Sequence, residues 1–98
     1  MKIWVDDTRM PSSKWEWCKT SQEAIMLLIG CKLFYESGYD NQVPEIMSLD
    51  HDLGGDDTTR PIILWMRENE FWPTTVVVHS QNPVGREWLE GMIERYKV

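Results

Sequence analysis

Three polar clusters hold most of the side chains in this sequence that are suited to chemistry, and each follows a short apolar run. Residues 6–7 are Asp-Asp, residues 50–52 are Asp-His-Asp, and residues 79–82 are His-Ser-Gln-Asn. Short apolar runs are typical of buried strands. If these strands are parallel neighbours, all three clusters lie at one edge of the sheet, where open α/β folds bind ligands. The residue types indicate a site for a metal ion and a phosphate.

Three carboxylates occupy equivalent positions after the first and third apolar runs. Asp6 and Asp7 end the first run, and Asp50 follows the run that should form the adjacent strand. Clustered carboxylates repel one another unless a cation or shifted pKa values relieve the repulsion. Hard oxygen ligands suit Mg2+ or Mn2+, with water and substrate phosphate completing the coordination shell. The alternative is solvated or helix-capping aspartates; the shared edge favours Asp6, Asp7 and Asp50 as metal ligands.

Two histidines accompany the carboxylates. His51 follows Asp50 directly, and His79 follows three consecutive valines. Because an imidazole titrates near neutral pH, the two rings are candidates for general acid and general base if both face the crevice. Each histidine also has a structural alternative. For His51 the alternative is an exposed loop residue or a hydrogen-bonded structural imidazole, and for His79 it is a core histidine whose ring nitrogens are hydrogen-bonded.

The third cluster and the loop after Asp7 offer groups that bind an anion. Ser80 and Asn82 lie where the fourth strand passes into the last helix, and a helix start favours a phosphate through its free N–H groups and its dipole. Ser80 adds a hydroxyl donor, whereas Asn82 either contacts the ligand or caps the helix. Arg9 either clamps a phosphate with its planar guanidinium or pairs with Asp7. Gly85, one turn into the helix, permits close approach of a backbone or a ligand.

The remaining sequence predicts the elements that position these clusters. Thr20 and Glu23 fit a capping box, and Asn82-Pro83 is typical of a helix start. Trp15 and Trp17 share one face of the second strand, and the last apolar run suits a central strand buried on both faces. The predicted strands are residues 2–5, 15–19, 45–49 and 74–78, and the predicted helices are residues 20–34, 58–69 and 82–96. This alternation implies a mainly parallel α/β sheet, although the first connection is short for a parallel crossover.

Length and composition predict one soluble domain, residues 1–98. Ten basic and sixteen acidic residues give a formal net charge of −6. This charge argues against broad binding to a nucleic-acid backbone, but not against a small phosphorylated ligand beside a cation. Cys18 and Cys31 lack the spacing of a zinc site and are expected to be buried thiols in a reducing compartment. The longest apolar run is too short to span a membrane, and no signal peptide opens the chain, so a cytoplasmic location is expected. The aromatic content leaves a homodimer open.

The motifs in combination resemble a known family. The Asp-Asp pair after the first strand, Asp50 after the third and Ser80 after the fourth are similar to a response-regulator receiver domain. Residues 6–11 (DDTRMP), 48–54 (SLDHDLG) and 78–85 (VHSQNPVG) more closely resemble the cyclic-phosphate processing receiver-like domains of bacteria and phages. This resemblance spans nearly the whole chain. It implies an α/β, three-layer receiver-like (flavodoxin-like) fold with a truncated, mainly parallel four-stranded sheet.

The resemblance also implies a metal-assisted site acting on cyclic phosphates, either at RNA ends or in nucleotides. Carried over to this sequence, the metal ligands are Asp6, Asp7 and Asp50. The residues expected to act in catalysis are His51, Asp52 and His79, and those expected to bind phosphate are Ser80, Asn82 and Arg9. The chain departs from an ordinary receiver because the first receiver helix and the fifth strand with its lysine are missing. Asp50 nevertheless occupies the phospho-acceptor position.

Three functions are compatible with these observations. The first is a metal-dependent phosphoesterase-like enzyme that processes cyclic phosphates in a bacterial or phage-infected cell. The second is a non-catalytic binding module that sequesters a cyclic nucleotide or accepts a phosphoryl group. The third is a structural interaction domain with a vestigial acidic edge. Metal binding separates the third function from the other two, and turnover separates the first from the second.

Overall fold

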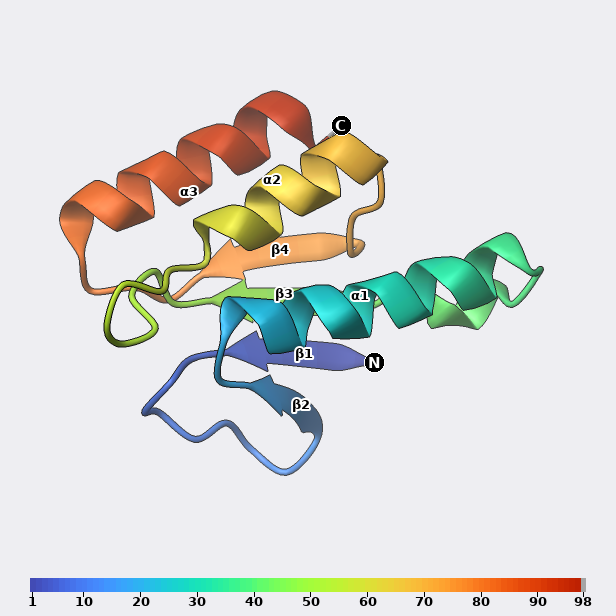
Figure 1. The fold of residues 1–98 in the computed structure, drawn as a ribbon, viewed down its shortest axis with the longest axis horizontal. Helices are drawn as coiled ribbons and strands as arrows, with labels where there is room; N and C mark the ends of the chain where they lie inside the picture. The colour runs from blue at the N-terminus through green and yellow to red at the C-terminus, as the bar shows by residue number, and fades with distance from the viewer. Residues whose placement is uncertain (98) are drawn as a thin grey trace.

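Four strands and three α-helices alternate along residues 1–97, which the computed structural model describes apart from the side chain of Asp40 (Figure 1). The strands are β1 (Lys2–Val5), β2 (Trp15–Cys18), β3 (Ile46–Leu49) and β4 (Thr75–Val78). The helices are α1 (Ser21–Glu36), α2 (Arg60–Asn69) and α3 (Pro83–Tyr96), and a single 3-10 turn, η1, covers Asp40–Gln42. The predicted order of elements is confirmed. Val98 lies outside the described residues.

The strands form one parallel sheet in the order β2-β1-β3-β4. This is the beginning of the 2-1-3-4-5 order of flavodoxin-like folds. In register, Val5 lies beside Leu49, and Leu49 lies beside Val78. The three strands therefore end side by side, as the sequence predicted. The α/β class and the truncated four-stranded parallel sheet are confirmed.

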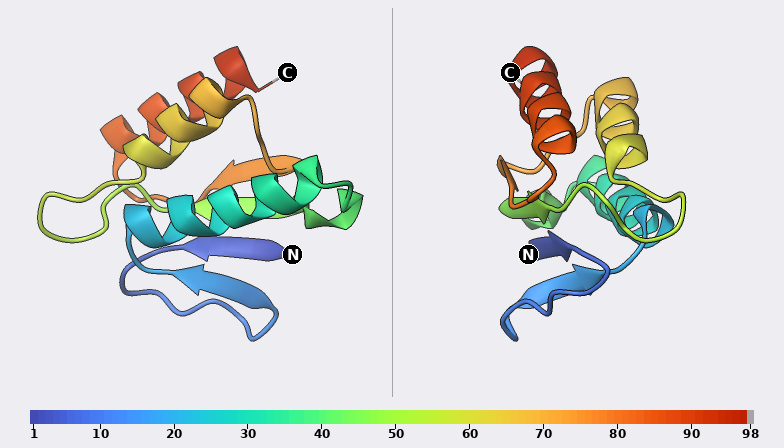
Figure 2. Two further views of the ribbon diagram at one scale, coloured as in Figure 1. Left: turned by 45° about the vertical axis from the view of Figure 1, so that its right-hand side comes forward. Right: turned by 90° about the vertical axis from the view of Figure 1, so that its left-hand side faces the viewer.

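Helices α1 and α2 lie on one face of this sheet and α3 lies beside α2 at the β4 edge, as the end-on view in Figure 2 shows. Alternate strand residues such as Ile3, Val5 and Met47 are fully buried against them. The predicted arrangement differs in its layers, because no helix of residues 1–97 covers the second face. The physical reason is local: the connection between β1 and β2 is a loop, where a helical crossover would have supplied a covering layer. The second face carries the alternate residues, among them Trp4 and Trp15.

Strand β4 is an edge strand, which corrects the expectation of a central strand buried on both faces. Within the described residues β4 pairs only with β3, and Val77 is 40 % exposed. An unbroken apolar run indicates burial on both faces but not the number of neighbouring strands. Val76 and Val78 pack on the core from this edge.

The local signals for helix starts are confirmed. The Thr20 hydroxyl accepts a hydrogen bond from the Glu23 N–H at the start of α1, and Pro83 opens α3 after its cap. Both cysteines are buried and free. Burial, with smaller contributions from Glu23 and Glu16, raises the pKa of the Cys18 thiol to about 11. None of the helices within residues 1–97 has the length and apolar character needed to cross a membrane.

Candidate metal and phosphate site

The carboxyl ends of β1, β3 and β4 bring the three polar clusters to one edge of the sheet. The backbone ladder continues one residue past each strand: the Asp50 N–H donates to Val5, and the His79 N–H donates to Leu49. Asp6 similarly donates to the carbonyl of Cys18 at the end of β2. The side chains after these strands therefore start from adjacent backbone positions, as expected for parallel strands.

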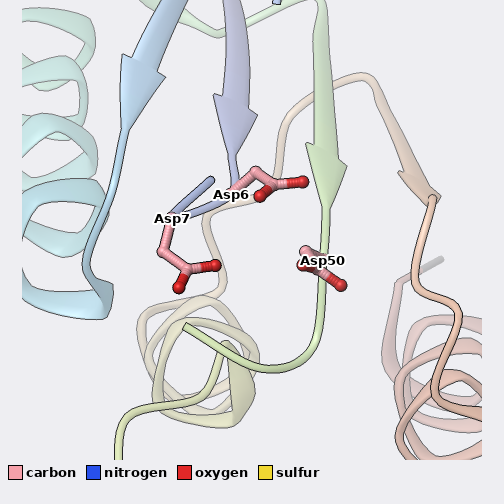
Figure 3. Close-up of side chains that lie close together, drawn as sticks. All are labelled: Asp6, Asp7 and Asp50. Carbon is pink, nitrogen blue, oxygen red and sulfur yellow. The ribbon is translucent and has the colours of Figure 1, made fainter. Parts of the chain in front are cut away.

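Asp6, Asp7 and Asp50 lie close together beyond the carboxyl ends of β1 and β3 (Figure 3). One carboxylate oxygen from each residue lies within 4.8 Å of the other two. The Asp7 carboxylate accepts no hydrogen bond from the described residues, and Asp50 accepts one, from the His51 N–H at 2.8 Å. These two residues keep free oxygen lone pairs. The cluster is able to bind a metal ion through hard oxygen ligands.

Asp6 differs from its neighbours because it is fully buried and its oxygens already accept hydrogen bonds. Oδ1 accepts the backbone N–H groups of Thr8 and Arg9, both at 2.9 Å, and Oδ2 accepts from Arg9 Nε at 3.1 Å and from His79 at 3.0 Å. Burial alone would raise the pKa of Asp6, but the Arg9 and Thr8 N–H groups, with His79 and the Arg9 charge, lower it overall. Asp6 therefore holds the loop after β1 in place as an ionised carboxylate.

Arg9 reaches back from this loop across the strand ends. It pairs with Asp6, and its Nη2 lies 3.9 Å from Asp50 Oδ1 and donates to the carbonyl of His79 at 3.1 Å. Arg9 therefore pairs with Asp6 and not with Asp7, which corrects the pairing considered from the sequence. The turn that places the Thr8 and Arg9 N–H groups on Asp6 also directs the guanidinium towards Asp6. The side chain remains 45 % exposed, so a donor face stays open to an anion.

His79 lies between a hydroxyl and a carboxylate. Its Nδ1 is 2.7 Å from Ser48 Oγ, and its Nε2 is 3.0 Å from Asp6 Oδ2. Since an ionised carboxylate only accepts, Nε2 carries the proton, and neutral Nδ1 accepts from the Ser48 hydroxyl. Burial lowers the pKa of His79, and the hydrogen bond to Asp6 opposes this shift. The ring also stacks on Trp4 at 4.0 Å between centroids.

His51 belongs to a second network, on the side of α2 and α3. The ring is buried, Arg60 Nε donates to its Nε2 at 2.9 Å, and its Nδ1 lies 3.1 Å from Asp52 Oδ1. Because Nε2 accepts, Nδ1 carries the proton and donates to Asp52. The Asn82 amide and the His51 ring lower the pKa of Asp52. Of the two alternatives for His51, the structure shows the hydrogen-bonded imidazole.

Ser80 and Asn82 build the start of α3. Asn82 Oδ1 accepts from the Gly85 N–H at 3.1 Å, which is the capping alternative, and its amide donates to Asp52 Oδ2 at 3.0 Å. The buried Ser80 Oγ accepts from the Asn82 N–H at 3.1 Å. Its own proton has no hydrogen-bond acceptor among the described residues. The structure thus groups Asp6, Asp7, Asp50, Arg9 and His79 at the strand ends. It joins His51, Asp52 and Asn82 in the neighbouring network.

Sequence reasoning assigned no role to four side chains that hold these networks. Ser48 orients His79, and Arg60 orients His51 while lying 4.6 Å from the Trp88 ring centroid. The indole N–H of Trp4 donates to the Arg9 carbonyl at 2.8 Å, and that of Trp17 donates to the Asp6 carbonyl at 2.7 Å. The alternation of β1 and β2 was the available signal. It places both indoles on the face opposite the core, beside the loop that they anchor.

Fold and site together define a receiver-like α/β domain with an acidic cluster at the carboxyl edge of its sheet. Residues 1–95 match the family described as the cyclic-phosphate processing receiver domain, and the chain belongs to that family. The suspected resemblance is confirmed. No curated protein and no solved structure matches the chain. Membership implies a role in cyclic-phosphate processing and a phosphate-containing partner.

Proposed function

We propose that this protein is a metal-dependent phosphoesterase that opens cyclic phosphates of nucleotides or RNA ends. One observation carries the proposed function: in a chain of the cyclic-phosphate processing receiver family, one oxygen from each of three carboxylates lies within 4.8 Å of the other two, beside a partly exposed guanidinium. The carboxylates suit a divalent cation, and the guanidinium suits a phosphate. A cyclic phosphodiester presents both requirements at once, because its anionic oxygens bind a cation and an arginine.

The local charges fit Mg2+ or Mn2+. Asp6, Asp7 and Asp50 contribute three negative charges, and Arg9 offsets one of them, so a divalent cation balances the cluster. Asp7 and Asp50 are the direct ligands in this proposal, since both have free oxygens, whereas Asp6 contributes its charge and holds Arg9. When bound, the cation polarises a phosphoryl oxygen and lowers the pKa of a bound water.

The remaining side chains bind the phosphate and handle protons. Arg9 donates to a non-bridging oxygen through its exposed face, and the Ser80 hydroxyl with the start of α3 stabilises developing negative charge. His79 keeps its proton on Nε2 towards Asp6, and so fixes that carboxylate in its ionised form. Asp52 is the proposed proton acceptor on the other side, because the His51 ring donates to it and orients it, and Asn82 links it to the start of α3.

The direct test is turnover. We expect the protein with Mg2+ or Mn2+ to convert 2′,3′-cyclic nucleotides to nucleoside monophosphates. Chromatography of the products measures this conversion. Asp50→Ala should lower the rate at least about 100-fold, the loss typical when a group acting on transition-state charge is removed. Asp56→Ala is the matched control, because Asp56 is an exposed carboxylate of the loop after β3. Equal rates in the two folded variants would reject Asp50 as a site residue.

A second candidate function is a receiver-like binding module. It is favoured by one observation: all four ring nitrogens of His51 and His79 already have partners within the protein, so neither ring is a free base. Such a module would sequester a cyclic nucleotide or accept a phosphoryl group on Asp50. Recovery of intact cyclic nucleotide bound to the protein, or a phosphoaspartate after incubation with acetyl phosphate and Mg2+, would support it over the enzyme.

A further inference from the structure

We propose that the uncovered face of the sheet binds single-stranded RNA, with successive bases stacking on its tryptophans and the RNA end entering the carboxylate site. The choice of RNA as the ligand rests on the function proposed above. The surface itself is defined by the structure. We call it the aromatic face, and it consists of Lys2, Trp4, Trp15, Trp17 and Lys19 with the adjoining loop.

The register of the strands places these side chains together. Lys2 lies beside Trp15, and Trp4 lies beside Trp17. Ile3 and Val5, which alternate with Lys2 and Trp4 along β1, are fully buried under the helices. Lys2, Trp4, Trp15 and Trp17 therefore project from the opposite face, which no helix of the described residues covers (Figure 2). Aromatic side chains on an open sheet face form a common platform for the bases of single-stranded RNA.

The tryptophan rings are held and accessible to cations. Trp4 and Trp17 use their indole N–H groups to anchor the Arg9 and Asp6 carbonyls, so their rings are fixed. Lys2 Nζ lies 5.8 Å from the Trp15 ring centroid, and Lys19 Nζ lies 4.4 Å from that of Trp17. A base that stacks on one of these rings would take the place of the lysine ammonium group. The displaced lysine would then bind a phosphate between the bases.

The charge of this part of the chain is opposite to that of the rest. Residues 1–20 hold four basic and three acidic residues, and two of those acids are Asp6 and Asp7 in the site. Residues 21–98 hold six basic and thirteen acidic residues. A chain with a net charge of −6 thus has its aromatic face beside a local excess of lysine and arginine. Proteins that bind single-stranded RNA combine basic and aromatic side chains in this way.

The aromatic face is continuous with the carboxylate site. Trp4 stacks on His79 with an angle of 8° between the rings, and His79 contacts Asp6. Trp15 packs edge-on against Trp4 at 5.7 Å. A strand whose terminal phosphate lies beside Arg9 therefore has its preceding bases over these rings. A free cyclic mononucleotide would use the carboxylate site alone.

Binding of a fluorescently labelled short oligoribonucleotide, measured by anisotropy in EDTA, tests the surface independently of metal and turnover. We expect Trp15→Ala to weaken binding roughly 5- to 100-fold and Trp15→Phe to keep most of it. Lys19→Ala should also weaken binding and lower the salt dependence by about 0.7 in the logarithmic slope. The exposed Lys19 keeps the test valid if Trp15→Ala misfolds. Lys32→Ala, on α1 at the helical face, is the matched control and should leave binding unchanged.

The outcomes separate this surface from the proposed function. If the oligoribonucleotide binds through the aromatic face but no cyclic phosphate is opened, the surface is retained and the enzyme function fails. If cyclic mononucleotides are opened but oligoribonucleotides bind no more tightly than they do, or Lys32→Ala and Lys19→Ala behave alike, the surface is rejected. Self-association that Trp15→Ala abolishes, without RNA binding, would also reject it and assign the face to a second copy.

Discussion

At the scale of single residues, a chain of three side chains fixes the charge of the candidate site. The Ser48 hydroxyl donates to His79, and His79 donates to Asp6, so each buried polar group has a partner. Asp6 in turn accepts the two N–H groups that shape the loop carrying Asp7 and Arg9. The carboxylate that sequence alone presents as a metal ligand is therefore also the structural centre of the loop.

Ser48→Ala tests this chain at its far end. The substitution leaves Nδ1 of a largely buried ring without its donor, which should lower the free energy of unfolding by about 1–3 kcal/mol. Urea denaturation measures the change. Ser13→Ala, in the exposed loop before β2, is the control and should change stability by less than about 0.5 kcal/mol. Equal midpoints for the two variants would mean that the ring does not depend on the Ser48 hydroxyl.

At the scale of elements, the packing of α3 against the His51 network depends on one glycine. A Cβ added at Gly85 would lie 2.3 Å from His51 Cγ, whereas one added at Gly91 on the same helix meets nothing within 4 Å. The helix can approach His51 closely only because residue 85 has no side chain. This contact fixes the cap residue Asn82, which bonds Asp52, relative to the end of β3.

The two glycines give a matched pair of substitutions in one helix. Gly85→Ala should destabilise the protein by roughly 1–3 kcal/mol, because His51 or the helix must shift. Gly91→Ala should stabilise it by about 0.5–1 kcal/mol, since alanine is the better helix former and no contact opposes it. Thermal unfolding followed by circular dichroism measures both. Changes of the same sign would contradict the close approach of α3 to His51.

The sequence predicted the elements better than their surroundings. Apolar runs and capping residues are local signals. The sequence therefore predicted the strand ends at Asp6, Asp50 and His79, and it also predicted the helix caps at Thr20 and Asn82. The edge position of β4 was not, because an apolar run does not encode how many strands lie beside it. The pairing of Arg9 with Asp6 depends on the turn conformation, and the role of Ser48 depends on a ring that lies 31 residues further along the chain.

At the scale of the whole molecule, charge is unevenly distributed along the chain, because residues 1–20 carry a formal net charge of +1 and residues 21–98 one of −7. The acidic residues are concentrated in the helical part and the carboxylate edge, while lysines and tryptophans gather around β1 and β2. Uniform acidity would repel a phosphorylated ligand from every side. Here basic side chains lie at Arg9 and on the aromatic face, so the net charge of the chain does not by itself decide which anions it binds.

The cluster of Asp6, Asp7 and Asp50 predicts that stability depends on divalent cations. Without a cation, the three carboxylates repel one another, and Asp7→Asn should raise the free energy of unfolding by about 1 kcal/mol in EDTA, the interaction of two unit charges at this separation in water. With Mg2+ at a hundred times its dissociation constant, the wild type should gain about 2.7 kcal/mol, a rise in Tm of roughly 10–20 °C for a domain of this size. Asp7→Asn should lose most of that gain, whereas Asp56→Asn, at an exposed loop position, should keep it. Differential scanning fluorimetry with Mg2+ and with EDTA measures the three proteins in both conditions. A wild type that Mg2+ and Mn2+ do not stabilise would exclude the metal site, and with it the part of the proposed function that depends on a cation.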